Sequence, residues 1–525
     1  MSMNSQGRPS RPAEAIAEGE HQTFTGNKGL NLEEPLSFDL GRFDETGVDI
    51  PPMPEGAPES RLGDMARTDT IGLPGLSEPE TMRHYVRLSR QNYAIDAGLY
   101  PLGSCTMKHN PRLNEKAARL PGFIDTHPLQ PLSTVQGALE AMEQLADWLT
   151  TLTGMPAVAL SPKAGAHGEL CGLMAIRAAI EAKGEDRNRI LVPESAHGTN
   201  PATAAFCGFK VDSIPATGQG RVDLAAMKEK LGDDVAGIML TNPNTCGLFE
   251  NEIIEIADAI HAAGGYFYCD GANFNAIVGR VRPGDLGVDA MHINLHKTFS
   301  TPHGGGGPGA GPVVLSEALA PFAPRPFHVR NGDTLTLVED ESQDIEGTKP
   351  FGRLTAFHGQ MGMFTRALTY MLSHGADGLR QVAEDSVLAA NYVLARLKGE
   401  FTASFDGPCM HEALFDDRFL EGTGVTTLDF AKAMIDEGYH PMTMYFPLVV
   451  HGAMLIEPTE TESKESIDLF CDALLDLAHD AKAGNTERFS GAPFHAPRAR
   501  LDETHAARKP VLVWPGVEQA SEAAE

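Results

Sequence analysis

The chain has 525 residues, of which 42% are hydrophobic and 22% are charged, proportions that are ordinary for a globular protein. Its formal net charge of −29 argues against nucleic acid or an anionic membrane as a partner, because polyanions would be repelled. No apolar run approaches the roughly 18 residues of a membrane span. Residues 1–20 carry acids and lack an apolar core, so we expect no signal or transit peptide and a cytoplasmic location.

Seven cysteines occur, at positions 105, 171, 207, 246, 269, 409 and 471. They are scattered, with no CxxC pair and no Cys/His spacing suited to zinc. We therefore expect reduced thiols and no metal site.

Composition and periodicity divide the chain into four segments. Residues 1–85 are rich in proline, glycine and charge, which predicts an extended arm that packs on the body or on a partner. Alternating helical and strand patterns then predict a large domain over 86–376. A long helical pattern at 378–399 leads into a smaller C-terminal α+β domain, 377–490, and a tail follows at 491–525.

Helical and strand-like units alternate along the large domain. Helical patterns cover 138–154, 168–184, 223–232 and 251–265, and apolar strands are predicted at 157–160, 189–195, 235–240 and 266–270. This alternation predicts an α/β fold with a mainly parallel sheet covered on both faces. Ligands of such sheets bind at the carboxyl ends of the strands.

Small residues follow the first of these strands. Ala164, Gly165 and Ala166 precede a helix that we expect to begin near Gly168. Free backbone N–H groups and the positive end of a helix dipole can bind phosphate. The same small residues could equally serve only close packing, and no GK[ST] follows, so the segment is not a Walker loop.

Two polar residues stand at the ends of later strands. His197 lies just beyond the 189–195 strand and could be an ordinary hydrogen-bonded loop residue or a ring that stacks on a flat cofactor. Asp270 ends the 266–270 strand, where a buried carboxylate must be paired. It is therefore either a turn-capping residue or the counter-ion of a buried cation.

Lys297 follows a strand-like run at 292–296 and precedes a tract of glycines that begins at Gly304. Such a lysine could be a surface residue at a strand exit. Withdrawn from water, it becomes the amine nucleophile that Schiff-base chemistry needs. The glycines at 304–307 would let the backbone approach a bound molecule, and a strand-like pattern at 311–319 argues against a linker.

Taken together, these four features fit one cofactor. A phosphate cradle, a stacking ring, a buried acid and an amine, in this order on an α/β sheet, fit pyridoxal 5'-phosphate. The lysine would form the Schiff base, and the aspartate would keep the pyridine nitrogen protonated so that the ring accepts electrons. The residues alone predict an amino-acid transformation and do not select its substrate.

Longer blocks of sequence resemble the second subunit of the glycine cleavage system P-protein. They include "YPLGSCTMKHNPRLNE" at 100–115, "SAHGTNPA" at 195–202, "DGANFNAIVG" at 270–279, "NLHKTFSTPHGGGGPGAGP" at 294–312 and "YFPLVVHGAMLIEPTETESKE" at 445–465. The similarity runs from about residue 80 to residue 514. It implies fold type I among pyridoxal-phosphate enzymes, the aspartate aminotransferase-like fold, with a seven-stranded type of sheet.

The same resemblance assigns roles to individual residues. It implies that Lys297 is the Schiff-base lysine, that Asp270 pairs with the pyridine nitrogen and that His197 stacks on the ring. It also implies that Ala164, Gly165 and Ala166 lie at the cofactor phosphate and that His296 and Thr298 flank the cofactor. The substrate pocket would be lined by Ser104, Cys105 and Thr106.

The activity implied is that of glycine dehydrogenase (decarboxylating): loss of CO2 from glycine and transfer of the remaining aminomethyl group to the lipoyl group of the H-protein. The partners implied are a separate subunit 1, two copies of each subunit, and lipoylated H-protein. One alternative is another fold type I enzyme acting alone on a small amino acid, resembling a hydroxymethyltransferase or a decarboxylase. A second is a non-catalytic scaffold subunit.

Overall fold

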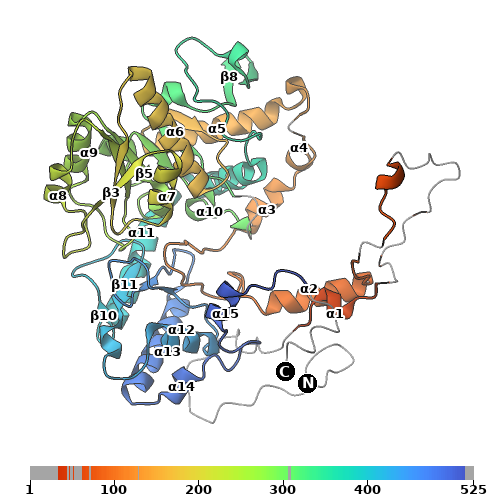
Figure 1. Ribbon diagram of the computed structural model, residues 1–525, viewed down its shortest axis with the longest axis vertical. Coiled ribbons are helices and arrows are strands. Elements are labelled where there is room, and N and C mark those ends of the chain that lie inside the picture. Colours follow the sequence, from red (N-terminus) through yellow and green to blue (C-terminus); the bar gives the residue numbers. More distant parts are fainter. Residues whose placement is uncertain are drawn as a thin grey trace.

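The computed structural model describes residues 34–43, 47, 51, 62–69, 72–127, 129–304 and 309–514. Most of the predicted arm before residue 72, residues 515–525 of the predicted tail and the glycines at 305–307 lie outside these described residues. Two sheets organise the rest, and a two-stranded hairpin, β8 (Phe327–Asn331) and β9 (Thr334–Val338), is attached to the larger one (Figure 1). The domain boundaries that the sequence suggests stay a prediction.

The larger sheet has seven strands in the order β1-β7-β6-β5-β4-β2-β3. The strands are β1 (Ala157–Ala159), β2 (Arg189–Pro193), β3 (Lys210–Ile214), β4 (Val235–Thr241), β5 (Tyr266–Asp270), β6 (Ala290–His292) and β7 (Val313–Leu315). Only β7 runs antiparallel to its neighbours. The prediction of a mainly parallel sheet is confirmed, and β4 and β5 are buried along their whole length, as apolar central strands should be.

Helices cover both faces of this sheet (Figure 1). They are α5 (Gln136–Thr153), α6 (Gly165–Lys183), α7 (Thr199–Phe206), α8 (Leu224–Glu229) and α9 (Ile253–Ala262). One core joins α5, α8 and α9 to the sheet, and a second joins α6 and α7 to its other face. Gly154 and Gly184 end α5 and α6 with φ of 69° and 71°, the left-handed C-cap conformation that glycine adopts without strain.

Four local predictions need correction. Helix α6 begins at Gly165 rather than near Gly168, because the small residues before Gly168 already have helical backbone. Lys297 does not end a strand: β6 stops at His292 and one helical turn, α10 (Leu295–Thr298), carries the lysine. Helix α7 and strand β3 are absent from the predicted elements. The β3 sequence "KVDSI" is not predicted as a strand because it is largely exposed at the sheet edge and lacks an apolar run.

The smaller sheet is antiparallel, in the order β10-β11-β13-β12. Its strands are β10 (Thr402–Ala403), β11 (Ala413–Asp416), β12 (Thr443–Met444) and β13 (Met454–Ile456), and the helices around it are α12 (Thr427–Asp436), α13 (Lys464–Lys482) and α14 (Glu487–Ser490). A backbone bridge pairs Leu102 with Ile456. A segment that precedes the large sheet in the chain is therefore hydrogen-bonded to the small sheet.

A long helix, α11 (Met361–Leu397), connects the two sheets. It breaks at Gly375, whose φ is 64°, so its second half corresponds to the helix predicted at 378–399. Residues before and just after the break pack on the large-sheet core, and residues from Ala390 to Leu397 pack on the small-sheet core.

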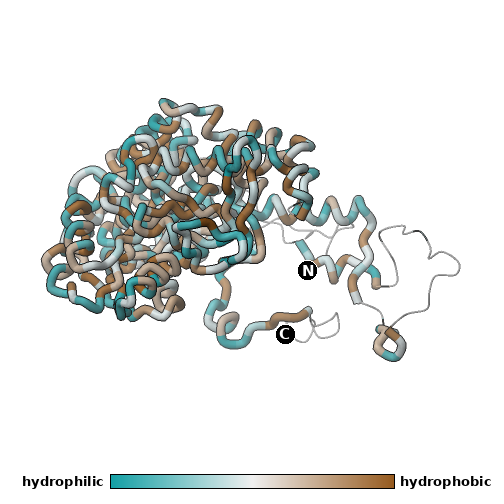
Figure 2. The backbone as a smooth tube through the Cα atoms, turned by 90° about the horizontal axis from the view of Figure 1, so that it is seen from above, coloured by the Kyte–Doolittle hydropathy of each residue, from teal (hydrophilic) through white to brown (hydrophobic). Residues whose placement is uncertain are grey.

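The remaining elements are short and lie mostly at the periphery. The α-helices are α1 (Ser37–Leu40), α2 (Glu78–Arg90), α3 (Arg112–Ala118), α4 (Pro121–Ile124) and α15 (Glu503–Arg508), and the 3-10 turns are η1 (Gly63–Met65), η2 (Leu132–Thr134), η3 (Gly271–Ala276), η4 (Pro283–Leu286), η6 (Ala320–Phe322), η7 (Glu341–Gln343) and η8 (Asp417–Leu420). Helices α1 and α2 lead away from the body (Figures 1 and 2). Among the described helices, none combines the length and the apolar composition that a membrane crossing requires.

Candidate active site

A cavity of about 180 Å³ lies at the carboxyl ends of β4, β5 and β6, beside the N-terminus of α6. Six of the residues predicted from the sequence line it: Ser104, Gly165, Ala166, His197, Asp270 and Lys297. Residues that were not predicted complete the wall: Glu169, Thr199, Thr241, Thr245, Ala272, Asn273, His292 and Asn294. The structure thus brings together segments that are nearly two hundred residues apart in the chain.

Lys297 reaches this cavity from the single turn α10. Asn294 is the N-terminal cap residue of that turn, and its carbonyl accepts the Lys297 N–H. The Lys297 Nζ donates a hydrogen bond of 2.8 Å to the Ser104 carbonyl. The amine is therefore directed across the cavity toward a segment held by the small sheet.

Asp270 is the last residue of β5, and only 4% of it is exposed. Its Oδ2 accepts a bond of 3.0 Å from the Asn200 amide, and its Oδ1 accepts one of 2.9 Å from the Ala272 N–H. Burial opposes ionisation, but His292, these two donors and Lys297 together hold the pKa of Asp270 below its ordinary value. Asp270 is therefore a buried anion, suited to a cationic ligand atom.

His292 lies close to Asp270 and is absent from the residues predicted from the sequence. Its Nε2 lies 3.3 Å from Asp270 Oδ1, and its Nδ1 lies 2.6 Å from the Tyr268 hydroxyl. Strands β5 and β6 are neighbours with Cys269 opposite Met291, so His292 follows at the same level as Asp270, at the ends of the two strands. The sequence predicts no role for His292 beyond its place in the strand-like run at 292–296.

His197 lies beside the cavity with its ring exposed. Its Nδ1 is 2.8 Å from Thr199 Oγ1, and its ring centroid is 5.7 Å from that of Phe446 at an interplanar angle of 68°. Thr199 in turn donates to Glu169 at 2.7 Å. Burial and the negative charge of Asp270 raise the pKa of Glu169, whereas the pKa of Asp270 is lowered.

The N-terminus of α6 forms one end of the cavity. The first N–H groups of a helix have no partner inside the helix, and the cap residue Ala164 offers no side-chain acceptor. A Cβ on Gly165 would lie 2.9 Å from Asn294 Oδ1, and one on Gly311 would lie 2.2 Å from the Ala164 carbonyl. Backbone donors thus stand close to the cavity where side chains do not fit, which suits a phosphate group.

Four predicted residues do not line the cavity with their side chains: Cys105, Thr106, His296 and Thr298. Burial raises the pKa of Cys105 to about 11 and lowers that of His296 to about 3. Ala164, the fifth predicted residue outside the cavity wall, contributes only as the cap of α6. The roles suggested for these five residues stay predictions.

Several buried polar atoms of the cavity wall are unused by the protein. Thr241 Oγ1, Asn273 Oδ1 and Asn294 Oδ1 have no hydrogen-bond partner among the described residues. Buried polar groups are normally satisfied, so these atoms are consistent with a polar ligand. With the amine, the buried anion and the α6 terminus, they fit pyridoxal phosphate.

A second titratable cluster, also missed in the sequence, lies behind Lys297. His411, Glu412 and Glu457 are fully buried, and one ligand atom from each lies within 4.8 Å of the others. Burial first, and then the charge of Glu457, raise the pKa of Glu412 well above its ordinary value, and burial also raises that of Glu457. Burial lowers the pKa of His411 to about 3, which keeps its imidazole neutral.

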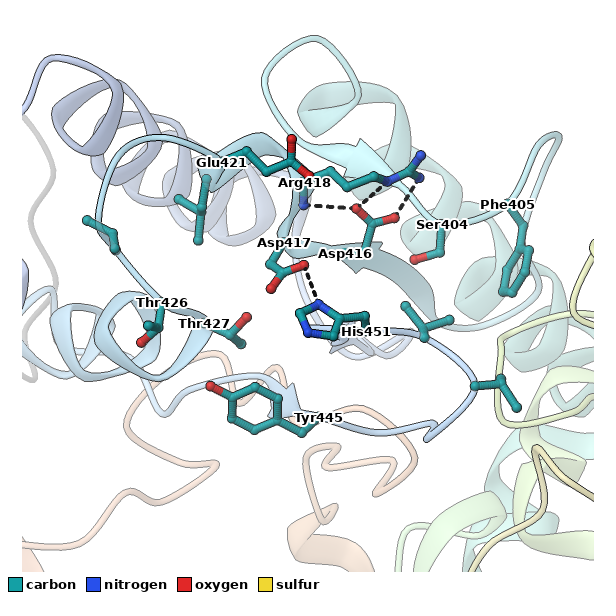
Figure 3. Close-up of a pocket in the computed structure, with 14 residues that line it drawn as sticks. Ser404, Phe405, Asp416, Asp417, Arg418, Glu421, Thr426, Thr427, Tyr445 and His451 are labelled. Carbon is teal, nitrogen blue, oxygen red and sulfur yellow. Dashed lines mark hydrogen bonds and ion pairs between the residues drawn. The ribbon is translucent and has the colours of Figure 1, made fainter.

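A larger cavity, of about 790 Å³, lies beside the small sheet (Figure 3). Two pairs already form within its wall, Arg418 with Asp416 and His451 with Asp417. None of the predicted site residues lines it. Size therefore does not identify the reactive site, and the chemistry is concentrated in the smaller cavity.

Comparison with known proteins identifies the family. Residues 169–331 match the model of aminotransferase class-V, and residues 382–493 match that of the glycine dehydrogenase C-terminal domain. The probable glycine dehydrogenase (decarboxylating) subunit 2 of Caulobacter vibrioides is 70% identical over 526 residues, with 100% of both chains covered. The protein of the same name from Desulforamulus reducens is 48% identical, covering 92% of this chain and 99% of its own.

The chain belongs to the glycine dehydrogenase (decarboxylating) subunit 2 family. The resemblance found in the sequence is thereby confirmed.

Solved structures place this subunit 2 chain in its fold group. Glycine decarboxylase (P-protein) of the glycine cleavage system, in inhibitor-bound form, superposes with a TM-score of 0.66 at 21% identity, covering 79% of this chain and 93% of the other. The TDC of Oryza sativa with PLP and tryptamine gives a TM-score of 0.61 at 13% identity, covering 82% and 93%. The prediction of fold type I is confirmed, and pyridoxal phosphate as cofactor agrees with these neighbours.

Proposed function

We propose that this chain is the cofactor-bearing subunit of a glycine dehydrogenase (decarboxylating). It would remove CO2 from glycine with pyridoxal phosphate and transfer the aminomethyl group to the lipoyl group of the H-protein. Its partner would be subunit 1, with two copies of each subunit in the assembly. One observation carries the proposal: within this family, the Lys297 amine and the buried Asp270 carboxylate face one cavity that the N-terminus of α6 closes.

Pyridoxal phosphate, when bound, supplies an aldehyde that captures amines and an electron-poor ring that accepts the electrons left by a departing carboxylate. Lys297 would hold the aldehyde carbon and Asp270 the protonated ring nitrogen. The backbone N–H groups of Gly165 and Ala166 would bind the phosphate, whose charge the helix dipole favours. His197, at the cavity edge, would cover one face of the ring.

The protein's own contribution is orientation and charge. The two donors to Asp270 are fixed in advance by α7 and η3, so no rearrangement is required when a positive charge forms opposite it. Burial and the charge of Asp270 raise the pKa of Glu169, which opposes a second negative charge at the same place. Cavity walls that keep water away from the reacting substrate carbon would protect that carbon from protonation before the aminomethyl group is transferred.

Borohydride reduction followed by peptide mapping tests the first half of the proposal. The label should be found on Lys297, and a label on another residue, or none, would refute the assignment. The second half is tested by exchange of radiolabelled bicarbonate into glycine. We expect exchange to require subunit 1 and lipoylated H-protein, whereas an enzyme acting alone would exchange without them and a scaffold subunit would bind no cofactor.

A further inference from the structure

The segment that contacts the Lys297 amine has an unusual backbone. Ser104 and Thr106, on either side of Cys105, have φ values of 61° and 50°. Residues other than glycine rarely adopt this left-handed region and do so only where their surroundings hold them in it. A local restraint must therefore act on the turn 104–106.

Two buried carboxylates supply that restraint. Glu412 Oε2 accepts the Ser104 N–H at 2.7 Å and the Ser104 hydroxyl at 3.2 Å. Glu457 Oε2 accepts the Thr106 N–H at 2.8 Å, and its Oε1 accepts the Thr106 hydroxyl at 2.6 Å. Each strained residue is thus bound twice by one carboxylate, through its backbone and through its side chain.

Both carboxylates are themselves fixed by the small sheet. Glu412 immediately precedes β11 and Glu457 immediately follows β13, two strands that pair with each other, and both side chains are fully buried. The Glu457 N–H also donates to the Pro101 carbonyl at 3.2 Å. The turn is consequently held from one end of the two central strands of the small sheet.

The turn binds the amine directly, since the Ser104 carbonyl accepts a hydrogen bond from Lys297 Nζ at 2.8 Å. We propose that Glu412 and Glu457 are positioning residues, which hold the turn 104–106 in its left-handed shape so that the Ser104 carbonyl aims the Lys297 amine into the cavity. This inference rests on the proposed function of Lys297. It assigns to the small sheet the task of orienting an amine that the large sheet carries.

His411 is the third member of the cluster, and its surroundings argue against a bound metal ion there. Its Nε2 lies 3.8 Å from Glu457 and 4.0 Å from Glu412, and neither ring nitrogen has a hydrogen-bond partner among the described residues. A cation at this point would compete with the bonds from Ser104 and Thr106 and would face the nearby charge of Lys297. A neutral imidazole instead fills the space behind the two carboxylates.

The test measures how fast apo-protein forms a borohydride-reducible link between Lys297 and added pyridoxal phosphate. We expect Glu412→Ala and Glu457→Ala to slow link formation at least tenfold, and Glu412→Gln and Glu457→Gln, which keep an acceptor oxygen, to stay within threefold of wild type. Glu437→Ala is the matched control, because Glu437 is a buried carboxylate of the same part of the fold that pairs with Arg488. This variant should form the link at the wild-type rate.

Glycine provides a rescue that a merely structural role would not show. Because glycine adopts positive φ without strain, Glu412→Ala combined with Ser104→Gly should regain at least threefold in rate over Glu412→Ala alone. If the alanine variants do not fold, Thr106→Ala and Thr106→Gly make the same comparison: both lose the hydroxyl, and only the alanine keeps the strain. We expect the glycine variant to form the link at least three times faster.

Three results would overturn the inference. The first is a folded Glu412→Ala or Glu457→Ala variant that forms the link at the wild-type rate, and the second is equal rates for alanine and glycine at position 106. The third is one equivalent of divalent metal in the purified protein that disappears in His411→Ala. A wild-type label on a residue other than Lys297 would instead refute the proposed function, so the two failures are distinguishable.

Discussion

Asp270 on the large sheet and the pair Glu412 and Glu457 on the small sheet are all buried, but their pKa values move in opposite directions. Asp270, at the end of the large sheet, receives two hydrogen bonds and faces His292, so its pKa falls. Burial raises the pKa of Glu412 and of Glu457 at the small sheet, and a neighbouring negative charge, Glu457 for the first and Glu460 for the second, adds to the rise. All three carboxyls are buried and accept hydrogen bonds, so the charge that faces each one separates Asp270, which faces His292, from the two glutamates.

If Asp270 and the two glutamates all act through Lys297, the amine of Lys297 must be the reacting group. Lys297→Ala should lower glycine–bicarbonate exchange by at least about 10⁴-fold, as expected when a nucleophile is removed. Lys297→Arg keeps the positive charge but not the nucleophile, and it should lose as much. The measurement is exchange in the presence of subunit 1 and lipoylated H-protein, and substantial exchange by either variant would contradict the assignment.

Asp270 should matter through its charge. In Asp270→Asn the cofactor should still bind, but turnover should fall by about 10²- to 10³-fold, because a preorganised charge is lost. Glu169→Gln is the control: burial and the charge of Asp270 raise the pKa of that carboxyl, so removing its charge should cost about tenfold or less. If Asp270→Asn and Glu169→Gln lower kcat by equal factors, the charge of Asp270 is not what distinguishes the two carboxyls.

Glu460, another carboxylate whose side chain is buried, is compensated by a cation. Lys108 Nζ lies 2.6 Å from it and also donates to the Thr298 carbonyl beside Lys297. Lys108→Met should lower the free energy of unfolding by about 3–5 kcal/mol, since it leaves a buried charge unpaired. Loss of the exposed Arg177–Glu181 pair should cost less than about 0.5 kcal/mol. Urea unfolding of both variants would show whether loss of the buried pair lowers the free energy of unfolding more than loss of the exposed pair does.

The opposite pKa directions predict opposite effects of pH on stability. A carboxyl with a raised pKa keeps its proton where the unfolded chain has lost it, so its contribution falls as pH rises above the ordinary value of 4.5. Glu412→Gln removes this titration. Unfolding at increasing pH should therefore show wild type losing stability relative to Glu412→Gln, and a difference that is independent of pH would contradict the raised pKa.

The smallest effect concerns Cys105, which lies between the two carboxylates. Burial raises its pKa to about 11, and the charges of Glu457 and Glu412 act in the same direction. At pH 8 only about one thiol in a thousand would be ionised, so alkylation by iodoacetamide should be slow and should rise about tenfold per pH unit. Mass spectrometry of the peptide, with Cys105→Ser as background, measures the rate; rapid labelling at pH 8 would argue against burial.

The sequence predicted the site residues that the large sheet carries much better than those that the small sheet carries. Asp270 and Lys297 follow apolar runs, and in a parallel sheet strand ends meet at one edge, so their proximity followed from the pattern. Asn200 and His292 were missed because a helix after a short loop and a three-residue strand leave little periodicity. Glu412 and Glu457 act on Ser104 and Thr106 from more than three hundred positions away, and no local pattern reports such a pairing.

The bridge between Leu102 and Ile456 means that the small sheet is not encoded by one continuous stretch of chain. A Cβ on Gly103 would lie 2.5 Å from Leu455 Cγ, so the early segment lies directly against β13. A fragment beginning at residue 377 would lack this edge, and Glu412 and Glu457 would lose the donors that cover them. Such a fragment should be digested by protease far faster than the same residues in the whole chain, and adding a peptide spanning 98–110 should slow its digestion.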